Sequence, residues 1–214
     1  THAHVDHIAG LRQCCEHYHL PVGMHAEGRK LLRQAEAYGS IMGFAVDNMG
    51  DLEVQEIEDN AVLHLGETEI ECRYVPGHCP GSLCFVLPGE KAVITGDALF
   101  HYSIGRTDLP GGDYPTLIEK LKTRILTLPD DYRVLPGHGI ESVIGKERRY
   151  NSFLGLKLKD YGGKDRPQLV RGAAAAVRGA LLRRTQELPR CRAAATHLLP
   201  AGQQDIRGLR QHTV

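Results

Sequence analysis

The spacing of apolar residues near the start of the chain predicts two helices separated by a short strand. Apolar side chains recur at helical intervals over residues 8–19, and the pattern stops at Pro21, which cannot continue a helix. A second helical pattern covers residues 27–38 and stops at Gly39, a residue type that commonly ends helices. The short apolar run at residues 21–25 between the two helices is typical of a strand.

The pattern in the middle of the chain predicts a series of strands, followed by one helix and a last strand. After an acid-rich loop at residues 47–59, several short apolar segments are bounded by turn-forming residues, as strands are. Leucine and isoleucine at helical spacing then predict a helix over residues 114–128. The expected strands cover residues 61–65, 69–75, 83–87, 92–95 and 132–135.

Composition and charge narrow the classes of function. Hydrophobic residues make up 42% of the chain, which is ordinary for a globular protein. The 26 basic residues are balanced by 26 acidic residues, so no basic face for nucleic acid is expected. We also expect no membrane association, since no apolar stretch is long enough to span a bilayer and no signal peptide is visible. The six cysteines lack the spacing of a disulfide framework, which favours free thiols and a cytoplasmic protein; the sequence leaves the oligomeric state unknown.

The composition changes towards the carboxyl end of the chain. Residues 165–214 contain nine Arg, no Lys and three acids, whereas residues 1–164 contain eight Lys beside nine Arg. We therefore divide the chain into a domain of residues 1–164 and an Arg/Ala-rich tail of residues 165–214. Residues 173–184 could form a helix, although the composition favours a poorly ordered tail.

The densest group of metal-capable side chains lies at the very start of the chain. His2 and His4 stand two positions apart, and on an extended segment such residues point to the same side. Asp6 and His7, slightly further on, can turn towards a second ion. Imidazole and carboxylate groups suit zinc, so this segment predicts part of a metal site.

Further ligand candidates follow the ends of three predicted strands. His78 and His138 each follow a Pro-Gly pair, and Asp97 follows a glycine. Loops at strand ends commonly carry functional residues, because a strand fixes the side chain that comes after it. His78 and His138 could each complete one ion site, and Asp97 could bridge two ions about 3.5 to 4 Å apart. Cys79 is a possible soft ligand, but the imidazoles already complete the set. We expect two zinc ions, with iron or manganese as alternatives.

Together these motifs resemble the motif series of the metallo-β-lactamase superfamily. Two further stretches, residues 96–108 and 145–154, are similar to its short glyoxalase II-like (hydroxyacylglutathione hydrolase-like) branch. The resemblance spans about residues 1–155 and implies an α/β (α+β) fold, a four-layer αββα sandwich with the metals at one edge of two facing sheets. Family members usually carry strands before the first motif, so we expect one sheet to be incomplete in this chain. The motifs that carry the resemblance are Thr1 to His7, Pro76-Gly77-His78, Gly96-Asp97 and Pro136-Gly137-His138-Gly139.

The resemblance also implies how the ligands are divided and what they do. His2, His4 and His78 would hold one metal, Asp6, His7 and His138 the other, and Asp97 would bridge them. Asp6 and Asp97 would orient a hydroxide held between the two metals. Arg106 could bind a carboxylate of the substrate, or it could brace its loop by pairing with Asp108 or Asp113. True β-lactamases commonly have Cys where Asp97 stands, which argues against that activity.

The implied reaction is hydrolysis of a small thioester of the hydroxyacylglutathione type. One alternative is a mononuclear iron persulfide dioxygenase, a related branch that also shows the Gly-Arg-Thr-Asp sequence found at residues 105–108. Against it, His138 supplies a ligand for a second metal. Another alternative is an inactive metal-binding fragment, because the first strands of the family are absent from the sequence.

Overall fold

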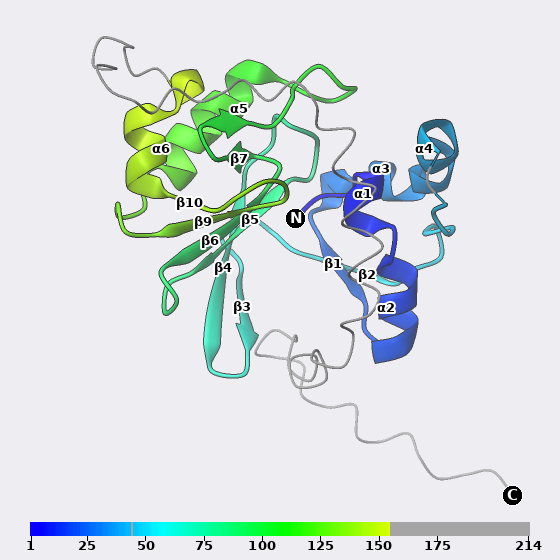
Figure 1. The fold of residues 1–214 in the computed structure, drawn as a ribbon. Coiled ribbons are helices and arrows are strands. Elements are labelled where there is room, and N and C mark those ends of the chain that lie inside the picture. The colour runs from blue at the N-terminus through cyan, green and yellow to red at the C-terminus, as the bar shows by residue number, and fades with distance from the viewer. Residues whose placement is uncertain (44, 155–214) are drawn as a thin grey trace, which may run out of the picture.

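Two sheets of unequal size form the centre of the fold, and helices cover their outer faces (Figure 1). The computed structural model describes residues 1–43 and 45–154. The larger sheet has six strands in the order β10-β9-β6-β5-β4-β3, the smaller one pairs β1 with β2, and β7 and β8 form a short hairpin. The strands are β1 (Val22–Met24), β2 (Val54–Glu56), β3 (Val62–Leu65), β4 (Thr68–Tyr74), β5 (Leu83–Leu87), β6 (Ala92–Gly96), β7 (Leu99–Phe100), β8 (Ser103–Ile104), β9 (Arg133–Pro136) and β10 (Ser142–Val143).

The helices fall into two groups on opposite sides of the sheets (Figure 1). The first group accompanies the smaller sheet and the second covers the larger one. The α-helices are α1 (Val5–Ile8), α2 (Leu11–Tyr18), α3 (Arg29–Arg33), α4 (Ala35–Met42), α5 (Tyr114–Lys120) and α6 (Ile144–Tyr150). The 3-10 turns are η1 (Ala26–Gly28) and η3 (Ser152–Leu154), and η2 (Leu121–Ile125) is a π-helical turn that follows α5.

Alternation of side chains along the strands gives the larger sheet two apolar faces. On one face, Val86 and Val93 are buried with Leu117 of α5. On the other face, Cys72 and neighbouring apolar residues pack against Ile57, which follows β2. A separate cluster joins α1, α3 and α4 to the smaller sheet. Each fully buried aliphatic side chain contributes about 1.5–3 kcal/mol of hydrophobic free energy. The order helix, sheet, sheet, helix confirms the expected four-layer αββα fold.

Strand direction brings separate parts of the sequence to one edge of the larger sheet. β6 and β9 are parallel, and β4 runs in the same direction because β5 is antiparallel to both β4 and β6. The carboxyl ends of these three strands therefore lie at the same edge. The start of the chain joins them there, since the N–H of Leu83 in β5 donates to the carbonyl of Thr1 at 2.9 Å.

The amino-terminal helices differ in detail from the sequence prediction. The helix expected over residues 8–19 is α2, which begins at Leu11 and ends where His19 adopts a left-handed conformation with φ 54°. The short helix α1 at Val5–Ile8 was not predicted. The helix expected over 27–38 is divided into η1, α3 and α4. Gly39 does not end it but lies buried inside α4, and Gly43 at φ 76° forms the end instead. The left-handed glycine that ends the helix is thus Gly43, and Gly39 is accommodated inside the helix where it is buried.

Several short elements were not predicted. β2 lies inside the acid-rich loop, and β7, β8, β10 and α6 have no counterpart among the predicted elements. Strands of two or three residues carry no usable hydrophobic period, so their formation depends on the partners that tertiary folding supplies. The helix expected over 114–128 is α5 followed by the π-helical turn. The boundary at residue 164 and the helix expected over 173–184 lie outside the described residues.

Within residues 1–43 and 45–154, no helix combines the length and the apolar character needed to cross a membrane.

The cysteines at positions 14, 15, 72, 79 and 84 are free thiols.

Replacing Gly77 by alanine should destabilise the protein by about 3 kcal/mol or more. Gly77 has φ 117°, and an added Cβ would lie 2.5 Å from the backbone nitrogen of Leu117. The exposed Gly89 offers a matched control, because a Cβ there would meet nothing within 4 Å. Gly89→Ala should change stability by less than about 0.5 kcal/mol. Urea unfolding measures both, and equal stability of the two variants would contradict the close packing of Gly77 on α5.

Candidate metal centre

The first group of predicted ligands comes from the extended start of the chain and from the turn after β4. His4 has φ −72° and ψ 148°, so His2 and His4 project to the same side of an extended segment. His2 Nε2 lies 3.1 Å from His4 Nδ1, and His78 Nε2 lies 2.9 Å from the same atom. The rings of His4 and His78 are almost perpendicular, at 86°. Three ring nitrogens therefore converge on one point.

The second group forms because the chain turns into a helix immediately after His4. Asp6 and His7 belong to α1, and His138 approaches from the loop after β9. The centre of the His7 ring lies 4.2 Å from that of the His2 ring, so the second group adjoins the first. His7 Nε2 and His138 Nε2 are 3.1 Å apart. Asp6 Oδ2 lies 3.2 Å from His138 Nε2. These three residues offer ligand atoms close enough to hold one ion.

Asp97 lies between the two groups. Its Oδ1 is 3.3 Å from His7 Nε2, while its Oδ2 is 3.7 Å from His78 Nε2 and 3.4 Å from His138 Nε2. Within the described part of the chain, the buried Oδ1 accepts no hydrogen bond. A buried carboxylate oxygen without a donor and facing imidazole nitrogens is well suited to a cation. The residues present therefore fit a pair of divalent metal ions.

The electrostatics of the site prepare these groups to act as ligands. Burial lowers the pKa of His2 and His78 and lowers the pKa of His4 to about 4. Burial alone would raise the pKa of Asp97, but the neighbouring imidazoles outweigh it and keep that pKa below its ordinary value. At neutral pH the three buried rings are uncharged and the carboxylate is ionised, as metal ligands must be.

Two contacts that orient the ligands could not be found from the sequence. His78 Nδ1 lies 2.8 Å from the carbonyl oxygen of Arg106, and His2 Nδ1 lies 3.2 Å from the hydroxyl of Thr1. A hydrogen bond at one ring nitrogen fixes which nitrogen is free to bind a metal. The sequence predicted a role for the guanidinium of Arg106, whereas in the structure its backbone carbonyl contacts the metal-ligand candidate His78. Any residue type can supply a carbonyl, so no sequence signal marks it.

Two glycines permit the close approach of backbone to the site. A Cβ on Gly105 would lie 1.8 Å from the carbonyl oxygen of Asp97, and a Cβ on Gly137 would lie 2.4 Å from Asp97 Oδ1. The loops that follow β8 and β9 can therefore pass beside Asp97 only with glycine at these two positions.

The remaining candidates are placed as follows. The guanidinium of Arg106 donates two hydrogen bonds of 2.7 Å to Asp108, the loop-bracing pair that was one of its two interpretations. Cys79 is fully buried, with a ligand-capable sulfur within 4.8 Å of ring nitrogens of His2, His4 and His78. Burial raises the pKa of the Cys79 thiol to about 11, and its Sγ is 3.3 Å from the Ser82 hydroxyl. This environment favours a neutral thiol packed beside the site.

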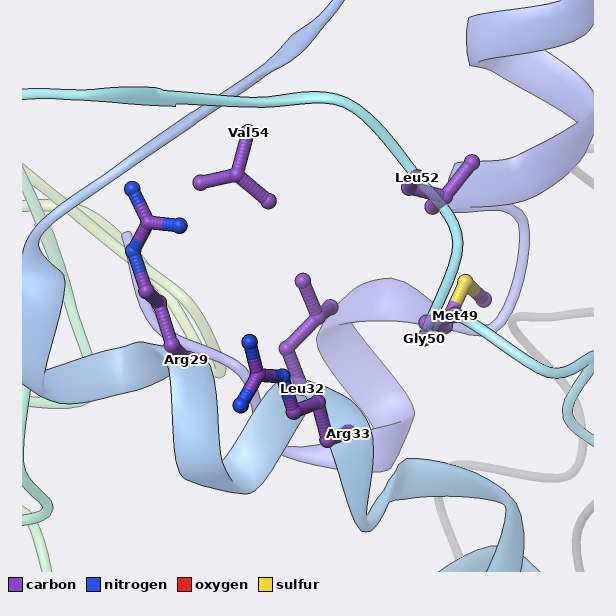
Figure 2. A pocket seen from close by; sticks show the side chains of 7 residues that line it. All are labelled: Arg29, Leu32, Arg33, Met49, Gly50, Leu52 and Val54. Carbon is purple, nitrogen blue, oxygen red and sulfur yellow. The ribbon is translucent and has the colours of Figure 1, made fainter.

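A shallow hollow lies away from the metal-capable groups, between α3 and the chain that leads into β2 (Figure 2). The side chains of Arg29 and Arg33 border it together with Leu32. None of the predicted ligands lines this hollow, whose lining residues are Arg29, Leu32, Arg33, Met49, Gly50, Leu52 and Val54.

Comparison with known proteins identifies the family. A family model described as "Metallo-beta-lactamase superfamily" matches residues 1–138. "Probable metallo-hydrolase YqgX" of Bacillus subtilis is 38% identical over 154 residues, which cover 72% of this chain and 73% of that protein. "Hydroxyacylglutathione hydrolase GloC" of Haemophilus influenzae is 36% identical over 164 residues, covering 73% and 74%. The crystal structure of TTHA1623 in a di-iron-bound form matches with a TM-score of 0.66 and 38% identity, covering 72% of this chain and 75% of that one.

These matches agree with the fold and with the geometry of the site. The family match includes every predicted metal ligand, from His2 to His138. The four-layer arrangement and the convergent imidazole and carboxylate groups are independent observations that point the same way. The chain is therefore a metallo-hydrolase of the metallo-β-lactamase superfamily.

Proposed function

We propose that this protein hydrolyses small thioesters of the hydroxyacylglutathione type at a dinuclear metal centre. His2, His4 and His78 would hold one ion and Asp6, His7 and His138 the other, with Asp97 between them. The observation that carries the proposal is the position of the Asp97 carboxylate, with one oxygen facing His7 and the other facing His78 and His138. The 36% identity to a hydroxyacylglutathione hydrolase supports the substrate class.

Side chains of the protein would bind the substrate, orient the attacking water and accept a proton from it. When bound, the two cations supply Lewis acidity that polarises an acyl carbonyl and acidifies a nearby water. Asp6 and Asp97 offer carboxylate oxygens that would orient the attacking water. Asp6 would accept its proton, because both oxygens of Asp97 face ligand imidazoles. Arg106 and Asp108 are both exposed, so Arg106 could exchange this partner for a substrate carboxylate at little cost.

The choice of metal and the number of metals separate this proposal from the iron dioxygenase alternative. Zinc suits the nitrogen and oxygen donors, and iron or manganese would suit them too; the similar structure of TTHA1623 is described as di-iron-bound. Asp6, His7 and His138 form a second ligand group that a mononuclear centre would leave unused. We therefore favour hydrolysis with two metals, on a small-molecule substrate. The free cysteines favour a cytoplasmic location.

Asp97→Asn should lower the metal content from about two equivalents per chain and reduce thioester turnover by about 100-fold or more. The amide keeps the shape of the side chain but has one coordinating oxygen and no charge. Asp131→Asn is a control, because Asp131 is an exposed carboxylate paired with Lys91. Elemental analysis and steady-state kinetics measure the two effects. Unchanged metal content in Asp97→Asn would contradict the bridging role.

The substrate class can be tested with one panel of assays on the full chain. We expect hydrolysis of lactoylglutathione and of a simple acyl thioester, lost on treatment with a chelator and restored by zinc. Nitrocefin should remain intact, and glutathione persulfide should cause no oxygen uptake. Oxygen uptake with the persulfide, together with a single iron and no thioester cleavage, would replace the proposal with the dioxygenase. Absence of all activities at full metal loading would favour an inactive metal-binding protein.

A further inference from the structure

Glu147 is a fully buried carboxylate in α6 that the proposed reaction does not use. Its relative exposure is 0%, and among residues 1–43 and 45–154 three groups donate hydrogen bonds to it. The backbone N–H of Tyr102 lies 3.1 and 3.0 Å from its two oxygens, and the side-chain amide of Asn151 donates to Oε2 at 2.8 Å. The hydroxyl of Ser142 donates to Oε1. Each of these donors is a neutral group, so hydrogen bonds hold the buried carboxyl group in place.

These hydrogen bonds hold the turn of the β7–β8 hairpin. Tyr102 lies in that turn with φ 55°, a left-handed conformation that is costly for a bulky residue and persists only where surrounding contacts impose it. Asn151 also donates from Nδ2 to the carbonyl of Ser103 at 3.0 Å. Glu147 and Asn151 therefore fix the tip of the hairpin to α6.

The other end of the hairpin carries the metal centre. Asp97 precedes β7 by two residues, and Arg106, whose carbonyl lies against His78 Nδ1, follows β8 by two residues. The N–H of Gly105 donates to the carbonyl of Ala98 at 3.4 Å, which closes the base of the hairpin between them. A shift of the hairpin tip would thus displace Asp97 and the orienting carbonyl together.

We propose that Glu147 is a positioning residue of the metal centre, acting through the β7–β8 hairpin on Asp97 and on the carbonyl of Arg106 that orients His78. The inference rests on the metal ligands of the proposed function and is independent of the thioester substrate. It assigns the buried polar pair of Glu147 and Asn151 a role in metal affinity beyond stability.

Glu147→Gln tests this role, because the amide keeps the side-chain volume but places an N–H₂ group among donors. In the full chain we expect zinc affinity, measured by competition with a chelator, to fall by about 10- to 100-fold. The hydrogen-bonded imidazole N–H proton of His78, observed by NMR in ¹⁵N-histidine-labelled zinc protein, should shift or exchange faster. Leu121→Ala, a buried core change near α5, should lower stability without either effect.

A second pair of variants keeps the test decisive if Glu147→Gln does not fold. Ser142→Ala and Asn151→Ala each remove one donor from the carboxylate, but only Asn151 also contacts the hairpin. Asn151→Ala should weaken zinc binding and alter the His78 resonance, whereas Ser142→Ala should do neither. Equal zinc affinity in the two variants, with an unchanged His78 signal, would overturn the proposal even if thioester hydrolysis is confirmed. Loss of affinity without any thioester activity would support it and contradict only the substrate class.

Discussion

The buried carboxylate of Asp97 is the constraint on which the functional end of this protein depends. Its side chain is 11% exposed, and a charge so far from water is costly unless positive charge or hydrogen bonds compensate. The surrounding histidines cannot compensate fully as cations, because burial lowers the pKa of His2, His4 and His78. An ionised carboxylate close to three rings that burial keeps uncharged is well suited to a metal cation.

Holding that carboxylate among imidazoles requires the sheet topology. The ligands come from positions as far apart as 2 and 138, and they meet because three strands point to one edge while Thr1 is tied to β5. The core on the other side of the sheet, where Val86, Val93 and Leu117 are buried, makes this edge rigid. Stability and chemistry are thus separated in space, with packing beneath the sheet and ligands at its end.

The support of the site reaches beyond the ligands themselves. Gly105 and Gly137 allow backbone to pass next to Asp97, and the carbonyl of Arg106 orients His78. Further back, Glu147 holds the hairpin that joins these parts. A metal site needs its ligands positioned within fractions of an ångström, which explains why polar groups are buried this deeply in α6 despite the cost of desolvating them.

The sequence alone determined the identity of the seven ligand candidates and the fold class. Histidine and aspartate at positions 2, 4, 6 and 7 can act as metal ligands because of their side-chain chemistry alone. An apolar run such as residues 83–87 predicts a buried strand from its composition alone. What the sequence could not determine is the parallel pairing of β1 with β2, the β7–β8 hairpin and the contact of Glu147 with Tyr102. It also missed the break between α3 and α4 at Gln34 and placed at Gly39 a helix end that lies at Gly43. These features join residues distant in the chain, or follow preferences weaker than the packing around them, so only the folded structure decides them.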